Sequence, residues 1–492
     1  MYTALTMQTA RRRLVVAGLL AVVCAFPASA SADGLAEDLA ARRSRVMERL
    51  GPDAMLVMWS APPRTYSLDI DYPYRQDSNL YYLTGIAQAE TALVLMPGNA
   101  TRKEILFVAD EDPVTEHWAG DILSHDEAAE RSGISTVLSI AAFDRFISAM
   151  LNRARYGPID RKESAMFSAA VADGRAKVAL LLERHDMNAA PSRELEFASK
   201  VRDGYVGIAV TNALDILTDL RMVKTPYEQR LLDRSLEIAG EALRAGMLVA
   251  RPGAYEYEVK AAVEAAHVAE GAFGWSFPSI VGTGPNTTVL HYPHSQRRIR
   301  DGDLVLVDAA ANYEYLAGDL TRTYPASGRF TPEQREIYEL VLAAQEAGIR
   351  AAVPGATLMD VHQAAVDVIR EGLLKLGLIT DATGEQYRLW FTHGSVHYIG
   401  IDVHDVGDLD RPLEPGMAFV IEPGIYVRQA AIESLSRTEG GVKTTEAIQP
   451  AVTRYLDMGI RIEDAFILEP GGLRRLTSDV PRTVDEIEAF LQ

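Results

Sequence analysis

Two carboxylates stand out in residues 304–325, which read LVLVDAAANYEYLAGDLTRTYP. Asp308 ends a run of four apolar residues, and Asp319 lies eleven positions later in a second strand-like stretch. In an antiparallel hairpin that pairs Asp308 with Asp319, the turn falls between Tyr313 and Glu314, and both side chains share one face. Their Cβ atoms would then lie about 5 Å apart, too close for two bare charges unless they share a cation. The alternative is an unrelated pair, with one Asp in a turn and the other at a helix cap.

The same pattern, an acid among apolar residues, occurs twice near the C-terminus. Glu422 lies in AFVIEPGIYV, and Glu463 lies in GIRIEDAFIL. A single acid of this kind is usually paired with a buried base, but the neighbouring strand-like segments offer only Arg322 and Arg461. Four acids in strand interiors therefore predict bound cations.

Three histidines accompany these acids, because His393, His397 and His404 all fall within FTHGSVHYIGIDVHDVG. A backbone carbonyl could satisfy any one of them, but three beside four buried acids indicate a site. Four carboxylates and one imidazole suit two divalent cations of the harder kind, such as manganese, cobalt or zinc. Two such ions would balance the four negative charges, and a hydroxide bridging them would be a nucleophile at neutral pH. This composition is typical of a metal-assisted hydrolase.

The rest of the chain must position these groups. Its 492 residues are 48% hydrophobic and carry a formal net charge of −19, which indicates a soluble protein of two or three domains and argues against a nucleic-acid partner. Apolar runs alternate with helical stretches up to about residue 215, which predicts an α/β domain; the C-terminal remainder reads as α+β, with hairpins rather than βαβ units. Helices are expected over residues 33–50, 225–247, 255–270, 332–352 and 358–376, and strands over 54–59, 92–96, 104–109, 304–308, 418–422 and 460–468.

The helix over residues 225–247 is expected to open the second domain. Thr225 can serve as its N-cap and Pro226 as its first helical residue, and Glu228 completes a capping box. The boundary just before this helix predicts domains over residues 33–217 and 218–492.

The first 32 residues have the layout of a secretory signal. Three arginines at 11–13 precede an apolar run over 14–26, and small residues come after it. Export to the periplasm or the medium is expected by the Sec route, and the arginine pair also fits the twin-Arg route. The run is too short for a comfortable membrane span, and Val23 is too bulky to precede a lipidated cysteine at Cys24, the only cysteine, so no stable membrane anchor is expected.

Five of the residues introduced above occur in an order that is characteristic of one family, namely Asp308, Asp319, His397, Glu422 and Glu463. With the motifs DAAANYEYLAGDLTRTYP, HGSVHYIGIDVHD, EPGIY and GIRIED around them, they resemble the pita-bread metallopeptidases, above all the Xaa-Pro aminopeptidases (aminopeptidase P) and prolidases. The similarity runs from about residue 221 to the C-terminus, and NLYYLTGI at 79–86 resembles the creatinase-like domain that precedes the catalytic one. The resemblance implies an α+β pita-bread domain after an α/β creatinase-like domain. It also implies two divalent metal ions, with manganese expected and cobalt or zinc as alternatives, held by those five residues.

The resemblance also implies roles for the residues around the metals. His291 and His404 would contact the scissile peptide, and Glu422 would shuttle a proton in addition to binding metal. Arg461 would support the ligands from the strand that leads to Glu463. His393 would line the substrate pocket.

The implied activity is that of an exported aminopeptidase that releases the N-terminal residue from peptides with proline in second position, by attack of a metal-bridging hydroxide. A prolidase restricted to Xaa-Pro dipeptides shares the motifs and is the first alternative. A non-catalytic pita-bread protein that binds a partner, or a creatinase-like enzyme without metal, is the second. A methionine aminopeptidase is disfavoured by the large N-terminal domain and by the signal. The resemblance further implies a homodimer or homotetramer.

Three features depart from the pattern of the family. Ala310 stands where glycine is frequent, and Ser295 stands where asparagine is frequent, but neither is a ligand position. The segment 428–458 is long and polar, and part of it is expected to form a loop near the cleft that affects substrate access.

Overall fold

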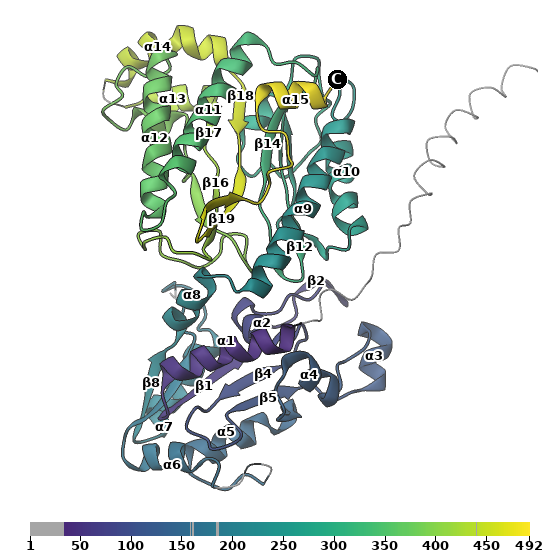
Figure 1. The fold of residues 1–492 in the computed structure, drawn as a ribbon, viewed down its shortest axis with the longest axis vertical. Coiled ribbons are helices and arrows are strands. Elements are labelled where there is room, and N and C mark those ends of the chain that lie inside the picture. The colour runs from purple at the N-terminus through teal and green to yellow at the C-terminus, as the bar shows by residue number, and fades with distance from the viewer. Residues whose placement is uncertain (1–33, 158, 160–161, 184–185, 439) are drawn as a thin grey trace, which may run out of the picture.

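The computed structural model describes residues 34–492 except 158, 160–161, 184–185 and 439 (Figure 1). The predicted signal sequence, including Cys24, lies outside the described residues. An N-terminal part and a larger C-terminal part meet near α8 (Leu214–Met222), and the predicted domain boundary at 217/218 falls inside this helix and stays a prediction. Within the described residues, no helix combines the length and the apolar character needed to cross a membrane.

The N-terminal part is built on a six-stranded mixed sheet in the order β6-β5-β4-β1-β7-β8. Pairing is antiparallel from β5 through β4 to β1 and parallel elsewhere. The sheet strands are β1 (Ala54–Trp59), β4 (Ala92–Leu95), β5 (Glu104–Val108), β6 (Val137–Ser139), β7 (Ala176–Leu180) and β8 (Ile208–Asn212). The short strands β2 (Thr65–Ser67) and β3 (Ile70–Asp71) form a separate hairpin.

Helices cover both faces of this sheet, which confirms the predicted α/β class. Along β1, Met55 and Val57 enter one core cluster while Leu56 and Met58 enter another, because successive side chains of a strand point to opposite faces. The helices are α1 (Leu35–Leu50), α2 (Ser78–Thr84), α3 (Pro113–Ala119), α4 (His125–Ser132), η1 (Ile140–Ala142), α5 (Phe143–Leu151), α6 (Ala165–Ala172) and α7 (Arg193–Gly204).

The C-terminal part places its strands between two pairs of long helices (Figure 1). The pair α9 and α10 lies on one side, and the pair α11 and α12 lies on the other. The capping box predicted at the start of α9 is present, since Thr225 accepts from the Glu228 backbone N–H and Glu228 accepts from that of Thr225. The helices are α9 (Pro226–Val249), α10 (Glu256–Ala269), η2 (Gly284–Thr288), α11 (Pro332–Ala351), α12 (Leu358–Lys375), η3 (Gln386–Leu389), α13 (Gln429–Leu435), α14 (Gly441–Tyr455) and α15 (Val484–Phe490).

The strands of this part form four small sheets with antiparallel pairing throughout. Their orders are β10-β11-β14, β13-β12-β9, β15-β16-β19-β20 and β17-β18. This confirms the α+β class with hairpins. The strands are β9 (Gly274–Trp275), β10 (Ile280–Thr283), β11 (Leu304–Asp308), β12 (Ala311–Tyr313), β13 (Leu316–Ala317), β14 (Thr321–Pro325), β15 (Val396–Tyr398), β16 (Ala418–Ile421), β17 (Gly424–Val427), β18 (Met458–Arg461), β19 (Asp464–Glu469) and β20 (Gly472–Arg475).

The predicted hairpin around the two aspartates exists, but its register was wrong by two residues. Asp308 pairs with Thr321 rather than with Asp319, and the turn lies between Tyr313 and Leu316. A shift of two residues keeps every side chain on its predicted face, since faces alternate with period two. Asp319 itself lies outside this pairing, between β13 and β14, but its ligand atom is still within 4.8 Å of that of Asp308.

Among the described residues of segment 428–458, which exclude 439, none lines the cavity of the site, so the expected loop near the cleft is not found there. The segment folds mainly into α13 and α14, which pack against each other, and α14 also packs against α11. Buried apolar residues such as Ile448 and Val452 recur four positions apart on α14, which explains why the segment forms a helix despite its polar composition.

Candidate metal centre

The four acids do not lie in strand interiors, as the sequence suggested, but where strands end. Asp308 is the last residue of β11, and Asp319 lies between β13 and β14. Glu422 lies between β16 and β17, and Glu463 lies between β18 and β19. At each of these places the chain leaves one sheet and enters another. The apolar flanks that suggested strand interiors are therefore two short strands on either side of a break.

The chain segment just after Asp319 and the segment at Glu463 are in direct contact. The Glu463 backbone N–H donates to the Thr321 carbonyl over 3.1 Å, and the Thr321 hydroxyl donates to Glu463 Oε2 over 2.8 Å. The two hairpins, which are far apart in the sequence, thus bring their acids to one point.

His397 lies at the centre of the group and comes from β15. Its Nε2 is 3.5 Å from Asp319 Oδ2, 3.7 Å from Glu422 Oε1 and 3.9 Å from Glu463 Oε1. Its Nδ1 lies 3.0 Å from the Tyr398 carbonyl, which fixes the ring with Nε2 toward the acids. Asp308 joins the group because its ligand atoms lie within 4.8 Å of those of Asp319 and Glu463.

Several carboxylate oxygens of this group are buried without compensation. Asp308 Oδ1, Asp319 Oδ1 and Glu463 Oε1 have no hydrogen-bond partner among the described residues. Of the two arginines that the sequence placed nearby, only Arg461 bonds a carboxylate of the group, from Nη2 to Asp308 Oδ2 over 2.6 Å. Arg322 instead pairs with Asp464 over 2.7 Å.

The shortage of positive charge perturbs the pKa values of the group. Burial raises the pKa of Asp319 to about 6 and that of Glu422 to about 7. Burial, together with the charges of Asp319 and Glu422, raises the pKa of Glu463 well above its ordinary value. Burial acts to lower the pKa of His397, but Asp319 and Glu422 stabilise the imidazolium and raise it to about 9. The unpartnered oxygens and this demand for positive charge fit a pair of divalent cations, which oxygen-rich ligand sets with an imidazole prefer.

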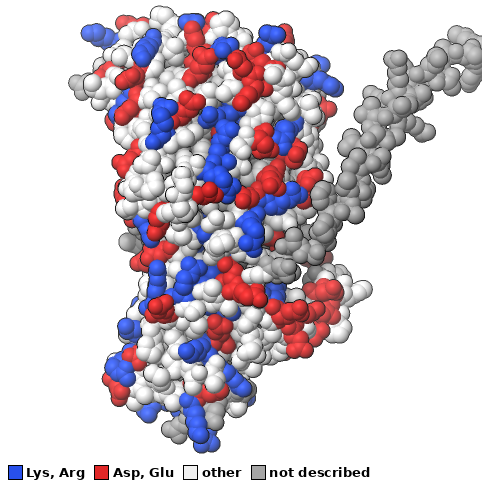
Figure 2. All heavy atoms as spheres, in the orientation of Figure 1, with Lys and Arg blue, Asp and Glu red and all other residues white. Residues whose placement is uncertain are grey.

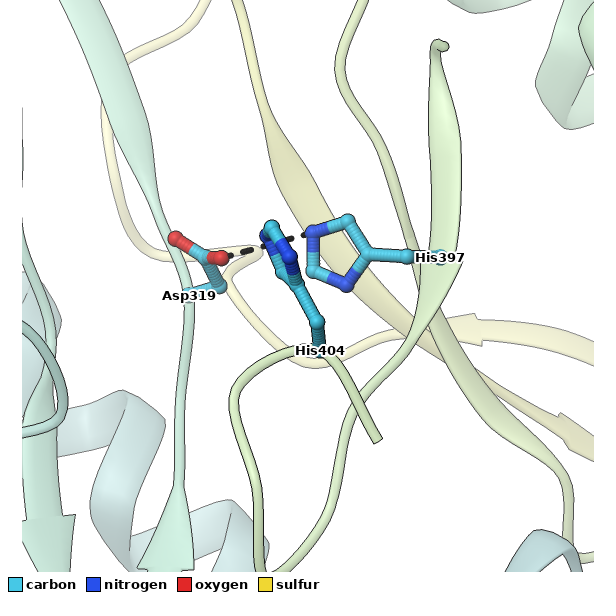
Figure 3. A group of neighbouring side chains, drawn as sticks. All are labelled: Asp319, His397 and His404. Carbon is cyan, nitrogen blue, oxygen red and sulfur yellow. Dashed lines mark ion pairs between the residues drawn. The ribbon is translucent and has the colours of Figure 1, made fainter. Parts of the chain in front are cut away.

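The group opens into a cavity of about 720 Å³, which His291, His393 and His404 also line. Figure 3 shows Asp319, His397 and His404 pointing toward one another from three segments. The ring centroids of His404 and His397 lie 4.2 Å apart. A ring nitrogen of His404 lies within 4.8 Å of the ligand atoms of Asp319 and His397. The structure therefore brings all nine sequence-predicted site residues to one cavity, with His404 close enough to reach either a metal or a substrate.

His393 takes part in a hydrogen-bonded chain that leads back to the acids. Its Nε2 lies 2.8 Å from the Tyr426 hydroxyl, which accepts from Arg461 Nη1 over 2.9 Å, and its Nδ1 lies 2.6 Å from the Gly394 carbonyl. Burial and the nearby Arg461 charge lower the pKa of His393 to about 3, so the ring is neutral at pH 7. With Nδ1 donating to the carbonyl, Nε2 accepts from the tyrosine.

Two functional contacts were missed by sequence reasoning, at Tyr426 and Thr321. Tyr426 links Arg461 to His393, and Thr321 bonds Glu463 while accepting from Arg461 Nε over 3.2 Å. Both lie within the motifs EPGIY and GDLTRT, close to an acid, so their position was a usable signal. The apolar wall of the cavity, which includes Phe277, carried no such signal.

A cluster of four acids and a histidine at the junction of small antiparallel sheets, flanked by two helix pairs and preceded by an α/β domain, defines a pita-bread metallopeptidase. Residues 230–470 match the metallopeptidase family M24, and residues 39–157 match the aminopeptidase P N-terminal domain. The chain belongs to the M24 metallopeptidases, in their aminopeptidase P group.

Individual relatives agree with this assignment over nearly the whole chain. The chain is 33% identical to the Xaa-Pro aminopeptidase of Escherichia coli (strain K12), with 92% of this chain and 96% of that protein covered. It is 29% identical to the mitochondrial intermediate cleaving peptidase 55 of Arabidopsis thaliana, over 92% of this chain and 83% of that protein. Among solved structures, the Pseudomonas aeruginosa aminopeptidase PepP superimposes with a TM-score of 0.77 at 33% identity, covering 92% of this chain and 97% of that one.

Proposed function

We propose that this protein is an aminopeptidase that removes the N-terminal residue from peptides with proline in second position, and that it works with two divalent metal ions, manganese first among them. The observation that carries the proposal is the set of Asp308, Asp319, Glu422 and Glu463 around His397, in which the first two acids and Glu463 each have a buried oxygen without a hydrogen-bond partner in the described part of the chain. The relatives named Xaa-Pro aminopeptidase and aminopeptidase P support the choice of substrate.

The five clustered residues would hold the cations. When bound, such metal ions would supply a nucleophile at neutral pH by lowering the pKa of a bound water. Glu422, which borders the cavity, is placed to take a proton and return it to the proline nitrogen. Cobalt or zinc remain alternatives to manganese on the same donor set.

The protein's own histidines would act on the peptide. His404 would donate to the oxygen on which charge develops, and His291 would hold the departing side of the bond, since both line the cavity. His393, which is neutral and held by Tyr426, would form part of the pocket wall. Arg461 would hold the Asp308 carboxylate in position.

Selection of proline would rest on the shape of the cavity and on the absence of a backbone N–H in proline. The cavity wall includes the apolar side chains of Phe277, Leu290 and Val396. An ordinary residue in place of proline would bring a backbone N–H into such a wall and leave it without an acceptor, whereas proline has none to satisfy.

Hydrolysis of Xaa-Pro dipeptides, tripeptides and longer peptides, with and without added manganese, tests the proposal. We expect manganese-dependent release of the N-terminal residue from tripeptides and longer peptides. Cleavage of dipeptides alone would indicate a prolidase, and no cleavage by the metal-loaded protein would indicate a protein that only binds a partner.

We also propose that the protein is exported, because residues 1–32 have the layout of a signal. Mass spectrometry of the mature N-terminus in cell fractions tests this, and a full-length chain in the cytoplasm would contradict it. The face of the molecule in Figure 2 carries acidic and basic side chains intermixed. We also predict a homodimer or homotetramer, and light scattering of the purified protein would measure its mass in solution.

A further inference from the structure

His404 sits on a short loop that is fixed on both sides of the histidine. The loop leaves β15 at Tyr398, and two acids, Asp402 and Asp405, flank His404. The Gly400 N–H donates to the Asp402 carbonyl over 3.1 Å, and the Asp405 N–H donates to the Tyr398 carbonyl over 2.9 Å. His404 itself is exposed on the cavity side, so the backbone of this loop sets where its ring lies.

Two buried basic side chains outside the catalytic cluster, Arg221 and Lys224, bind the two acids that flank His404. Arg221 Nη2 donates to Asp402 Oδ2 over 2.7 Å and also to Asp405 Oδ1. Lys224 Nζ donates to Asp405 Oδ2 over 2.7 Å. Arg221 and Lys224 are 2% and 3% exposed, and the Asp405 side chain is 1% exposed. Arg221 lies in α8 and Lys224 in the link to α9, so both belong to the connection between the two parts of the chain.

The N-terminal part of the chain completes this network with two residues of α2 and one residue that precedes α2. Arg221 Nη1 donates to Asn79 Oδ1 over 2.8 Å, and the Ser78 hydroxyl donates to Asp402 Oδ1 over 2.7 Å. Arg75 donates to the Ile401 carbonyl over 2.8 Å. The loop is thus held by side chains that do not line the cavity.

The network is closely packed, and burial does not neutralise Arg221 or Asp402 within it. A Cβ added to Gly400 would lie 2.0 Å from Asp405 Oδ2 and 2.6 Å from Lys224 Nζ, so the backbone and the ion pair are in close contact. Burial opposes the charge of Arg221, but Asp405 and Asp402 raise its pKa. Burial likewise opposes ionisation of Asp402, but Arg221 outweighs it and lowers the pKa. The ion pair between Arg221 and Asp402 therefore persists at neutral pH.

We propose that Asp405, held by the buried Arg221 and Lys224, is a positioning residue that fixes His404 beside the metal cluster. The proposal rests on the peptidase function, in which His404 contacts the reacting peptide. In this arrangement the connection between the two parts of the chain, together with α2, sets the geometry of a catalytic residue. Displacement of such a residue by about 1 Å is enough to slow an enzyme roughly a hundredfold.

The test is a double-mutant cycle between Asp405→Asn and His404→Ala, with kcat and KM measured on a manganese-loaded Xaa-Pro tripeptide assay. With His404 present, we expect Asp405→Asn to lower kcat by about 10-fold to 100-fold with little change in KM, because the loss concerns the transition state. In the His404→Ala background, the same substitution should lower kcat by less than about twofold, because no histidine remains to be displaced. Metal content and Tm of each variant are measured alongside.

Asp219→Asn is the matched control, since Asp219 also lies in α8 and pairs with Arg49 and Arg411 away from the His404 loop. It should leave kcat at the wild-type level. Equal losses in both backgrounds, or a wild-type kcat for Asp405→Asn, would overturn the positioning role alone. If Asp405→Asn does not fold, Ser78→Ala replaces it in the same cycle, with a few-fold loss expected only when His404 is present. A metal-loaded wild type that cleaves no Xaa-Pro peptide would overturn the peptidase function and this proposal together.

Discussion

The positive charge nearest the acids of the cluster comes from the guanidinium of Arg461 and the imidazolium of His397. In the metal-free protein, protons must supply the remaining compensation, which is why burial raises the pKa of Asp319 to about 6 and that of Glu422 to about 7. Metal ligands and groups that act on the substrate should therefore respond differently to substitution.

Alanine at Asp308, His397 or Glu463 should lose bound metal and turnover together, with kcat/KM reduced by at least about a hundredfold. His404→Ala should retain metal and lower kcat by roughly a hundredfold or more, as expected for the loss of a donor to a developing oxyanion. Metal content by emission spectrometry and tripeptide hydrolysis check both. Full activity in any of the three ligand variants would contradict the proposed site, and loss of metal from His404→Ala would make that residue a ligand.

Tyr426→Phe should lower the free energy of unfolding by about 1–3 kcal/mol, because it leaves the buried Arg461 Nη1 without its acceptor. Tyr324 provides the matched control, since its buried hydroxyl has no partner among the described residues. Tyr324→Phe should be neutral or slightly stabilising. Urea unfolding of both variants measures the difference, and equal effects would show that the hydrogen bond to Arg461 is not important.

At the scale of elements, the site depends on strands that end where the acids are needed. Strand β18 leads directly to Arg461 and Glu463, and it is held against η2 by close backbone packing at Gly459. The Gly459 N–H donates to the Thr287 hydroxyl over 2.9 Å, and an added Cβ would lie 2.0 Å from the Thr287 carbonyl oxygen. Glycine is required there by the approach of another backbone.

Gly459→Ala should destabilise the protein by about 1–3 kcal/mol and weaken manganese binding, because β18 must move away from η2 and carries Arg461 and Glu463 with it. Gly471→Ala is the control, since an added Cβ there meets nothing within 4 Å. We expect it to change stability by less than about 0.5 kcal/mol. Urea unfolding and manganese titration of both variants check this, and unchanged metal affinity in Gly459→Ala would separate β18 from the site.

At the scale of the whole molecule, folding creates the cluster and therefore couples stability to protons and metal. Asp319 and Glu422 have raised pKa values in the folded, metal-free protein, so their contribution to stability is fully present at low pH and is lost as the pH rises through about 6 and 7. His397 contributes in the same direction, and its contribution is lost as the pH rises through about 9. Metal binding requires the same protons to leave, so it strengthens with rising pH.

The rise in Tm on adding saturating manganese should therefore be larger at about pH 7.5 than at about pH 5.5, because each proton released changes metal affinity about tenfold per pH unit. Thermal unfolding with and without manganese across this range measures it. A His397→Ala variant should show little shift at any pH. A manganese effect that is constant or falls with rising pH would contradict the linkage.

The α/β and α+β classes, the helix that begins at Pro226 and the identity of the clustered residues could be predicted from the sequence. They depend on local patterns and on an imbalance of charge among residues that the hydrophobic pattern places inside. The hairpin register was predicted wrongly by two residues, because several turn positions satisfy the same alternation.

The sequence by itself indicated which acids lie among buried residues and predicted that they bind cations, because an excess of acids over bases in apolar segments can be read from the residue pattern. Only the tertiary structure decided that the acids lie at strand breaks, that Tyr426 joins Arg461 to His393, and that Arg221 reaches the loop of His404. These contacts join segments that are far apart in the chain. Their distances depend on how helices and sheets pack, and no local pattern in the sequence encodes that packing.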